Sequence, residues 1–228
     1  MQFVCILVAL TVIFAVACVL FRRKNRSFEG MICKFMASFG FISVAVLGNY
    51  LNNSANIKYF SLILFALMFG FCGDVFLGIK EIAPTFRKKL IPLGTGYFLI
   101  GHIFCVFAFS VLYGMNFKTL LFFGLGVLFG IVGVLALKVK GNIAFACLLC
   151  AYYGLLVWKI GYAAFLVKTQ AIVPNILVLI GSCLFLISDT CIGVLYFGHV
   201  KGKNALVTAE LTTYYTAQIL LAMSVVLR

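Results

Sequence analysis

Long apolar stretches alternate with short polar breaks along the whole chain. A helix needs about 20 apolar residues to cross the hydrocarbon core of a bilayer, and the stretches between the breaks reach this length. The pattern predicts eight transmembrane helices, at residues 2–21, 32–51, 59–79, 90–113, 118–137, 143–166, 173–197 and 205–227. We therefore expect an all-α integral membrane protein in which residues 1–228 form one transmembrane domain.

The composition excludes a soluble globular protein. Of the 228 residues, 65% are hydrophobic and 10% are charged, whereas a soluble domain has about 25% charged residues. A net charge of +13 would favour nucleic-acid binding on a soluble domain. Here the basic residues lie in short connections between apolar stretches, so no nucleic-acid partner is expected. The nine cysteines fall inside apolar segments, which argues against a disulfide framework.

The connections alternate in charge. The first, third, fifth and seventh connections hold Arg22, Arg23, Lys24 and Arg26, then Lys80, Arg87, Lys88 and Lys89, then Lys138 and Lys140, then Lys201 and Lys203. The other connections hold one lysine each, namely Lys58, Lys118 and Lys168. Since cytoplasmic loops carry the excess of Lys and Arg, we expect the odd-numbered connections to be cytoplasmic and both termini to lie outside. The protein would be a multi-pass protein of the plasma or inner membrane or of the endoplasmic reticulum.

Two aspartates interrupt the apolar segments: Asp74 within residues 69–78, and Asp189 at the end of residues 185–189. A charged side chain at the centre of a bilayer costs about 2.5–3.5 kcal/mol on insertion scales, and such residues usually serve a function. Both aspartates lie in the cytoplasmic halves of spans that we expect to run inward. Their matching surroundings suggest that the chain is built from two four-helix repeats of the same orientation.

Each aspartate has a structural and a functional interpretation. Asp74 could pair with Lys34, at the cytoplasmic start of the second span, and only hold two helices together. However, burial favours the protonated form of a carboxyl group, and two close carboxylates do not easily both ionise. One aspartate would then hold a proton while the other stays charged, which supplies the acid and base for hydrolysis without a metal. The chain has no clustered set of metal ligands, so neither a metal nor another cofactor is expected.

The helices that follow the aspartate spans are polar near their cytoplasmic ends. The fourth span holds Tyr97 and His102, which lie on neighbouring faces of a helix. The eighth span holds a polar stripe of period four and one further tyrosine. These residues are Glu210, Tyr214, Gln218 and Tyr215. Because lipid penalises polar side chains, the stripe should face the interior of the bundle.

Lys159 follows Trp158 in the outer part of the sixth span. A lysine that extends toward the membrane surface beside an interfacial tryptophan explains both residues without a function. We therefore expect Lys159 to lie outside any site.

Several short motifs follow one another along nearly the whole chain. They are Lys34, Gly73-Asp74, the segment from Tyr97 to His102, Phe185-Leu186 with Ser188-Asp189, and Tyr214-Tyr215 with Ala217-Gln218. In this order they resemble the YhhN-like lysoplasmalogenase family. The resemblance implies hydrolysis of the vinyl-ether bond of lysoplasmalogens, which releases a fatty aldehyde and glycerophosphoethanolamine or glycerophosphocholine.

The resemblance also implies roles for particular residues. Asp74 and Asp189 would be the catalytic acidic pair, and Lys34, His102 and Tyr214 would support them. Further candidates for substrate binding or support are Tyr97, Ser188, Glu210, Tyr215 and Gln218.

We expect the substrate to be a single-chain ether lipid that enters from the bilayer, with its head group toward the basic cytoplasmic connections. Two alternatives stay open. The aspartates could carry protons or cations in a small transporter, because repeats and intramembrane carboxylates are common in transporters. They could also be purely structural, in a scaffold without catalysis.

Overall fold

The structure is a computed structural model that describes residues 1–53, 55–139, 142–198 and 201–228. Lys140, one of the loop lysines, and His199 lie outside the described residues. Eight long helices account for most of the rest. They are α1 (Gln2–Arg23), α2 (Ser27–Leu51), α3 (Ile57–Ile82), α4 (Arg87–Tyr113), α5 (Leu120–Ala136), α6 (Ile143–Thr169), α7 (Val173–Phe197) and α8 (Lys203–Val226). Two short 3₁₀ helices, η1 (Pro84–Phe86) and η2 (Phe117–Thr119), precede α4 and α5.

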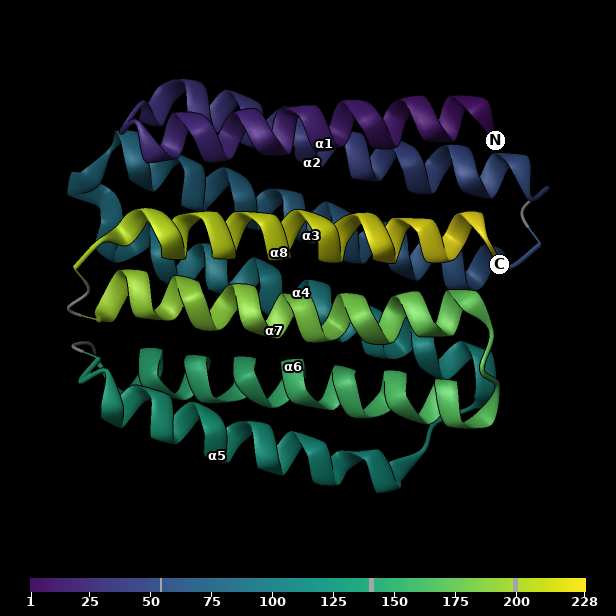
Figure 1. The fold of residues 1–228 in the computed structure, drawn as a ribbon. Coiled ribbons are helices and arrows are strands. Elements are labelled where there is room, and N and C mark those ends of the chain that lie inside the picture. The colour runs from purple at the N-terminus through teal and green to yellow at the C-terminus, as the bar shows by residue number, and fades with distance from the viewer. Residues whose placement is uncertain (54, 140–141, 199–200) are drawn as a thin grey trace.

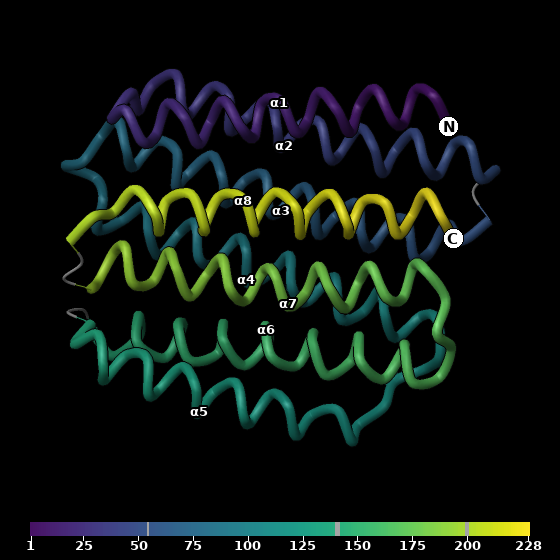
Figure 2. The backbone as a smooth tube through the Cα atoms, in the orientation of Figure 1, coloured from purple at the N-terminus to yellow at the C-terminus, as the bar shows by residue number. Residues whose placement is uncertain are grey.

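The helices lie side by side in one bundle, and each runs antiparallel to the next because the connections are short (Figure 1). Both termini lie at the same end of the bundle, as the tube in Figure 2 shows. The all-α fold and the eight helices are confirmed, and seven of them are candidate membrane spans. That α8 also crosses the membrane stays a prediction. The orientation in the membrane and the pair of four-helix repeats stay predictions.

Local signals set several helix ends. The side chain of Asn142 accepts a hydrogen bond from the backbone N–H of Phe145 at 2.9 Å and so caps α6. Helix α4 ends before Gly114, whose φ of 78° lies in the left-handed region that glycine adopts without strain. Pro174 lies in the first turn of α7, where its missing N–H costs nothing.

Seven of the helices, α1 to α7, are long and apolar enough to cross a membrane by themselves. The protein is therefore a multi-pass integral membrane protein. Large apolar side chains such as Phe3, Leu121 and Leu135 are about 70% exposed, as suits a surface that faces lipid.

Helix α8 is the least apolar of the eight long helices, and it packs against more of them than any other does. It packs against α1, α2, α3 and α7, whereas α5 packs on α6 alone among the described long helices. Glu210, Tyr214 and Gln218 are each at most 5% exposed, so the predicted inward-facing stripe is confirmed. The stripe brings polar groups into the middle of the bundle, where the two aspartate helices meet it.

Candidate active site

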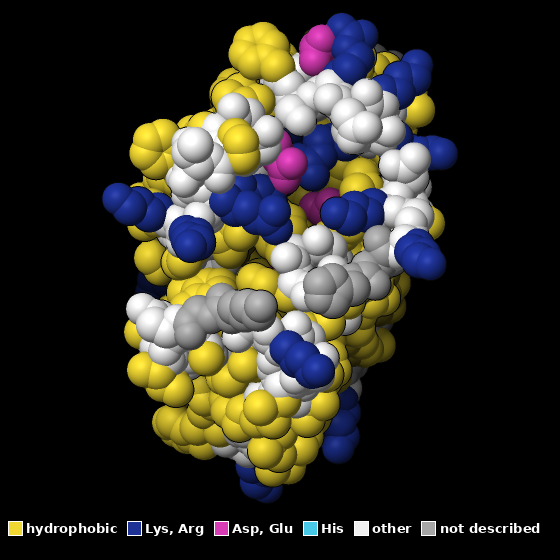
Figure 3. All heavy atoms as spheres, turned by 90° about the vertical axis from the view of Figure 1, so that its left-hand side faces the viewer, with side chains coloured by type: hydrophobic (Ala, Val, Ile, Leu, Met, Phe, Trp, Pro, Cys, Tyr) yellow, Lys and Arg dark blue, Asp and Glu magenta, His cyan; other side chains and the backbone are white. Residues whose placement is uncertain are grey.

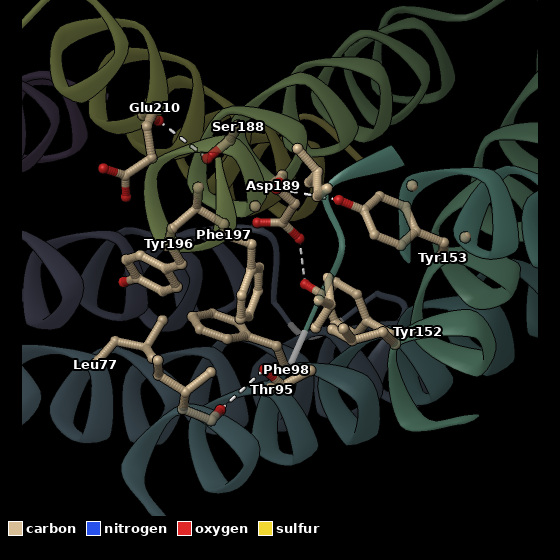
Figure 4. A pocket seen from close by; sticks show the side chains of 18 of the residues that line it. Leu77, Thr95, Phe98, Tyr152, Tyr153, Ser188, Asp189, Tyr196, Phe197 and Glu210 are labelled. Carbon is tan, nitrogen blue, oxygen red and sulfur yellow. Dashed lines mark hydrogen bonds between the residues drawn. The ribbon is translucent and has the colours of Figure 1, made fainter. Parts of the chain in front are cut away.

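Asp74 on α3 and Asp189 on α7 line the same cavity, which has a volume of about 80 Å³. The lining includes Phe197, the last residue of α7, and Val139, just beyond α5. The cavity therefore lies in the half of the bundle that we predict to be cytoplasmic. The other predicted site residues that line it are Lys34, Ser188, Glu210 and Tyr214. Figure 4 shows the carboxyl group of Asp189 pointing into this space.

Asp74 is fully buried and has three polar partners on neighbouring helices. Its Oδ1 lies 3.0 Å from Nζ of Lys34, which confirms the predicted pair. Its Oδ2 accepts hydrogen bonds of 2.6 Å from the hydroxyls of Ser38 and Tyr214. The amide of Gln218 in turn donates to the Tyr214 oxygen at 3.1 Å. Asp74 therefore has a cation at one carboxyl oxygen and two charge-assisted hydroxyl donors at the other.

Asp189 has different partners. The hydroxyl of Tyr152 donates a short hydrogen bond to its Oδ2. The hydroxyl of Tyr153 reaches only the backbone carbonyl of Asp189, at 3.2 Å. Among the described residues, no Lys or Arg forms an ion pair with Asp189. Its carboxyl group therefore has one hydroxyl donor and borders the cavity.

Tyr152 continues into a chain of polar groups that leads away from the cavity. Its oxygen lies 3.2 Å from Nε2 of His102, and Nδ1 of His102 lies 3.2 Å from Nζ of Lys159. Lys159 is 3% exposed, so the expectation that it extends to the membrane surface is wrong. Tyr152 and Lys159 are seven residues apart and thus share one face of α6. That spacing was the signal that could have placed both residues in the interior.

The other predicted residues differ in how close they lie to the two aspartates and the cavity. Ser188 directly precedes Asp189 in the sequence, but its hydroxyl does not contact the Asp189 carboxyl group. It donates to the backbone carbonyl of Glu210 at 3.0 Å. Glu210 lines the cavity at 5% exposure, and its carboxylate forms no ion pair within the described residues. Tyr97 stacks on Phe76, with ring centres 5.1 Å apart, and is not part of the described cavity lining.

Three further residues of the predicted set lie behind the cavity. Tyr215 packs on Tyr214, with ring centres 5.1 Å apart, and is likewise outside the described lining. Gln218 and His102 border a separate small cavity, together with Lys159. The structure thus brings six of the predicted residues to one cavity and connects Gln218 and His102 to it through tyrosines.

Charged side chains gather where the cavity meets the end of the bundle. This mouth cluster consists of the charged residues Arg22, Lys80, Glu81 and Arg87, together with Tyr196, which Lys80 and Arg87 contact. Glu81 pairs with Lys80 at 2.7 Å and with Arg22 at 3.2 Å, and Arg87 donates to the carbonyl of Tyr196 at 3.3 Å. Nζ of Lys80 lies 3.4 Å from the centre of the Tyr196 ring, which also lines the cavity. Figure 3 views this end, where basic side chains surround a hollow that contains acidic ones.

The described residues contain no group of three His, Cys, Asp or Glu side chains that could hold a metal ion. The polar side chains that line the cavity carry carboxyl, phenol, hydroxyl and ammonium groups. These can donate, accept and stabilise protons and positive charge.

Comparison with known proteins gives one clear relationship. No match was found among curated proteins or among solved structures. The sequence model of the YhhN family matches residues 30–225, which include both aspartates and every polar residue of the cavity. The chain belongs to the YhhN family.

Proposed function

We propose that this protein is a membrane-embedded hydrolase that cleaves the vinyl-ether bond of lysoplasmalogens. The products would be a fatty aldehyde and glycerophosphoethanolamine or glycerophosphocholine. The YhhN family includes lysoplasmalogenases. The observation that carries the proposal is that Asp74 and Asp189 line one cavity but have different partners. Acid and base catalysis needs such a pair, in which the environment separates the two protonation states.

Asp189 is the acid in this proposal. Cleavage of a vinyl ether begins when a proton is added to the β-carbon, which leaves an oxocarbenium ion. Asp189 borders the cavity, has no cationic partner in the described structure, and has a tyrosine hydroxyl on one oxygen only. Its other oxygen can hold the proton and give it to carbon.

Asp74 is the ionised partner. Its pair with Lys34 and its two hydroxyl donors keep it charged, so it can stabilise the positive oxocarbenium ion across the cavity. Water then attacks the carbon next to the ether oxygen, and Asp74 accepts the proton that this water loses. The resulting hemiacetal breaks down to the aldehyde and the glycerol hydroxyl without net gain or loss of protons.

The cavity and its mouth suit a lysophospholipid. Leu77, Phe98 and Phe197 give the cavity an apolar surface for the alkenyl chain. With the alkenyl chain in the cavity, the phosphate of the head group would lie near the cations of the mouth cluster. The carboxylate of Glu210, which has no ion-pair partner in the described residues, lies within reach of a head-group ammonium.

A small transporter is the second candidate, because the Lys34–Asp74 pair and the chain from Tyr152 to Lys159 place ionisable groups deep in the bundle. Such groups also occur in proton pathways. A transporter would move protons or cations across liposomes without consuming a lipid. A hydrolase would release aldehyde in micelles without a gradient.

The decisive experiment measures aldehyde release from lysoplasmalogen by the purified protein in detergent micelles with a chelator present. We expect release by the parent and its loss in Asp189→Asn and Asp74→Asn. An alkenyl glycerol without the phosphate should be cleaved with a higher KM. Folded parent protein that releases no aldehyde would overturn the proposal, and proton flux in liposomes would then be measured to test the transporter.

A further inference from the structure

Three buried ionisable side chains have no part in the two-aspartate mechanism. They are Tyr152 and Lys159 of α6 and His102 of α4, each at most 5% exposed. With Asp189 they form one continuous series of hydrogen bonds across three helices. A buried polar network of this kind is costly unless each member is satisfied. A purely structural role would not need a histidine and a lysine behind a single carboxyl group.

The series has one possible direction. Tyr152 uses its only proton to donate to Oδ2 of Asp189, so its oxygen must accept from Nε2 of His102. Neutral His102 therefore carries its proton on Nε2, and its Nδ1 accepts from Lys159. Every donor points toward Asp189. A shift of one proton along each bond would deliver a proton from Lys159 to Asp189.

No carboxylate among the described residues pairs directly with Lys159. None of the ion pairs in the described structure includes it, and its Nζ lies over the ring of Phe185, 4.4 Å from the ring centre. The one hydrogen-bond partner that the structure gives this amine is His102. A buried lysine in such a position exchanges its proton more readily than a lysine paired with a carboxylate.

The far end of the series opens on a second cavity of about 10 Å³, lined by Lys159, His102 and Gln218. This volume is that of about one water molecule, and three polar side chains can bind it. Gln218 donates to Tyr214, which donates to Asp74. The small cavity therefore lies between the partners of the two aspartates. Phe98 lines both cavities and forms part of the wall between them.

We propose that Lys159, His102 and Tyr152 form a proton relay that reprotonates Asp189 after each turnover. The inference rests on the proposed hydrolase function. Asp189 loses one proton to carbon, and the attacking water loses one proton to Asp74. In the relay, Tyr152 passes its proton to Oδ2 of Asp189, His102 passes its Nε2 proton to Tyr152, and Lys159 passes one to Nδ1 of His102. Rotation of the Asp189 carboxyl group, the Tyr152 hydroxyl and the His102 ring then restores the starting arrangement. Lys159 regains a proton from water that exchanges through the small cavity, which leaves hydroxide, and Asp74 releases its proton to water. The two ions neutralise each other in the solvent, so the cycle balances.

The relay predicts that its loss slows reloading and leaves the first chemical step intact. The test compares the first turnover with the steady state by rapid mixing of excess lysoplasmalogen with the parent, His102→Gln and Lys159→Met. Glutamine can still donate to Tyr152, but an amide does not pass a proton between its two ends. Lys168→Met is the matched control, because Lys168 lies on the same helix and is exposed.

In His102→Gln and Lys159→Met we expect a first turnover near the parent rate, followed by a steady state that is about 100-fold slower. Lys168→Met should keep both rates. An equal decrease in the rates of the first and later turnovers would show that the hydrogen-bonded series only supports the fold, and would overturn the relay. Unchanged rates in both variants would overturn it as well.

The relay and the hydrolase can fail separately. A parent protein that releases aldehyde while the variants show no difference between phases would remove the relay and leave the hydrolase. No aldehyde from the folded parent would remove both. If Lys159→Met does not fold, Lys159→Gln replaces it, since it keeps a donor near His102 and lacks the transferable ammonium proton.

Discussion

Asp74 and Asp189 share one cavity, yet their surroundings differ in charge, in burial and in the number of donors. Asp74 is fully buried between a lysine, a serine and a tyrosine from two other helices. Asp189 is partly exposed to the cavity, and the carboxyl group has one tyrosine donor. The same residue type therefore has a cation and two hydroxyl donors in one place and a single hydroxyl donor in the other, which is the difference on which the proposed division between charged group and proton carrier rests.

The comparison also separates stability from reactivity. The partners of Asp74 come from α2 and α8, so its ion pair and hydrogen bonds join three helices. The one donor to the Asp189 carboxyl group leads instead into the relay. We expect changes around Asp74 to lower the free energy of unfolding and changes around Asp189 to lower the rate.

The largest difference should follow from replacing each aspartate by asparagine. Asp74→Asn leaves Lys34 buried without a counter-charge, which costs about 3–5 kcal/mol of stability. Asp189→Asn should change the free energy of unfolding by less than about 1 kcal/mol while the rate falls by about 10²–10⁴-fold. Unfolding in detergent and aldehyde release measure the two effects.

A double variant distinguishes charge from shape at Asp74. Lys34→Met combined with Asp74→Asn removes both members of the pair and should recover most of the lost stability, because no charge is left buried alone. It should recover no activity. Equal destabilisation by Asp74→Asn and Asp189→Asn would contradict the expectation that Asp74 contributes more to stability than Asp189 does.

Two tyrosines allow a finer version of the same comparison. Tyr214→Phe removes a 2.6 Å donor from charged Asp74 and should cost about 1.5–3 kcal/mol of stability. Tyr152→Phe removes the donor to Asp189 and should reduce the steady-state rate about 100-fold, with a smaller loss of stability. The ratio of rate loss to stability loss is the readout. A similar ratio for both variants would mean that the two aspartates are equivalent.

Part of this arrangement could be predicted from the sequence, because the membrane makes polar residues conspicuous. The number of helices, the inward stripe on α8 and the Lys34–Asp74 pair follow from the positions of a few polar residues in apolar segments. Lys34 could be identified because it lies at the predicted depth of Asp74. In each case the cost of placing a charge in lipid limits the choices.

The relay could not be predicted in the same way. Lys159 near a helix end satisfies the membrane equally well by extending to the surface or by meeting a partner inside, and only the packing of α6 against α4 decides. The prediction for Tyr97 is wrong in the opposite direction, because a residue expected at the site lies outside the described cavity lining. It lies near His102 in sequence but stacks on Phe76 outside the cavity, because an apolar helix gives little signal of which face turns inward.

The smallest effect should come from two serines, and it tests whether contact or sequence position decides a role. Ser188 is next to Asp189 in sequence, yet its hydroxyl donates to a helix carbonyl of Glu210. Ser38 is far from both aspartates in sequence, yet it donates to Asp74 at 2.6 Å. Ser38→Ala should therefore cost about 1 kcal/mol of stability and reduce the rate several-fold, since the ionised carboxylate loses one of its donors.

Ser188→Ala is the matched change and should cost only a few tenths of a kcal/mol, because the Glu210 carbonyl can keep the backbone hydrogen bond of its helix. Aldehyde release and unfolding of the two variants, measured side by side, give the answer. If Ser188→Ala were the more damaging change, the neighbour of Asp189 would act through a contact that appears only with substrate bound. The assignment of the proton-carrying site to Asp189 and Tyr152 would then have to include Ser188.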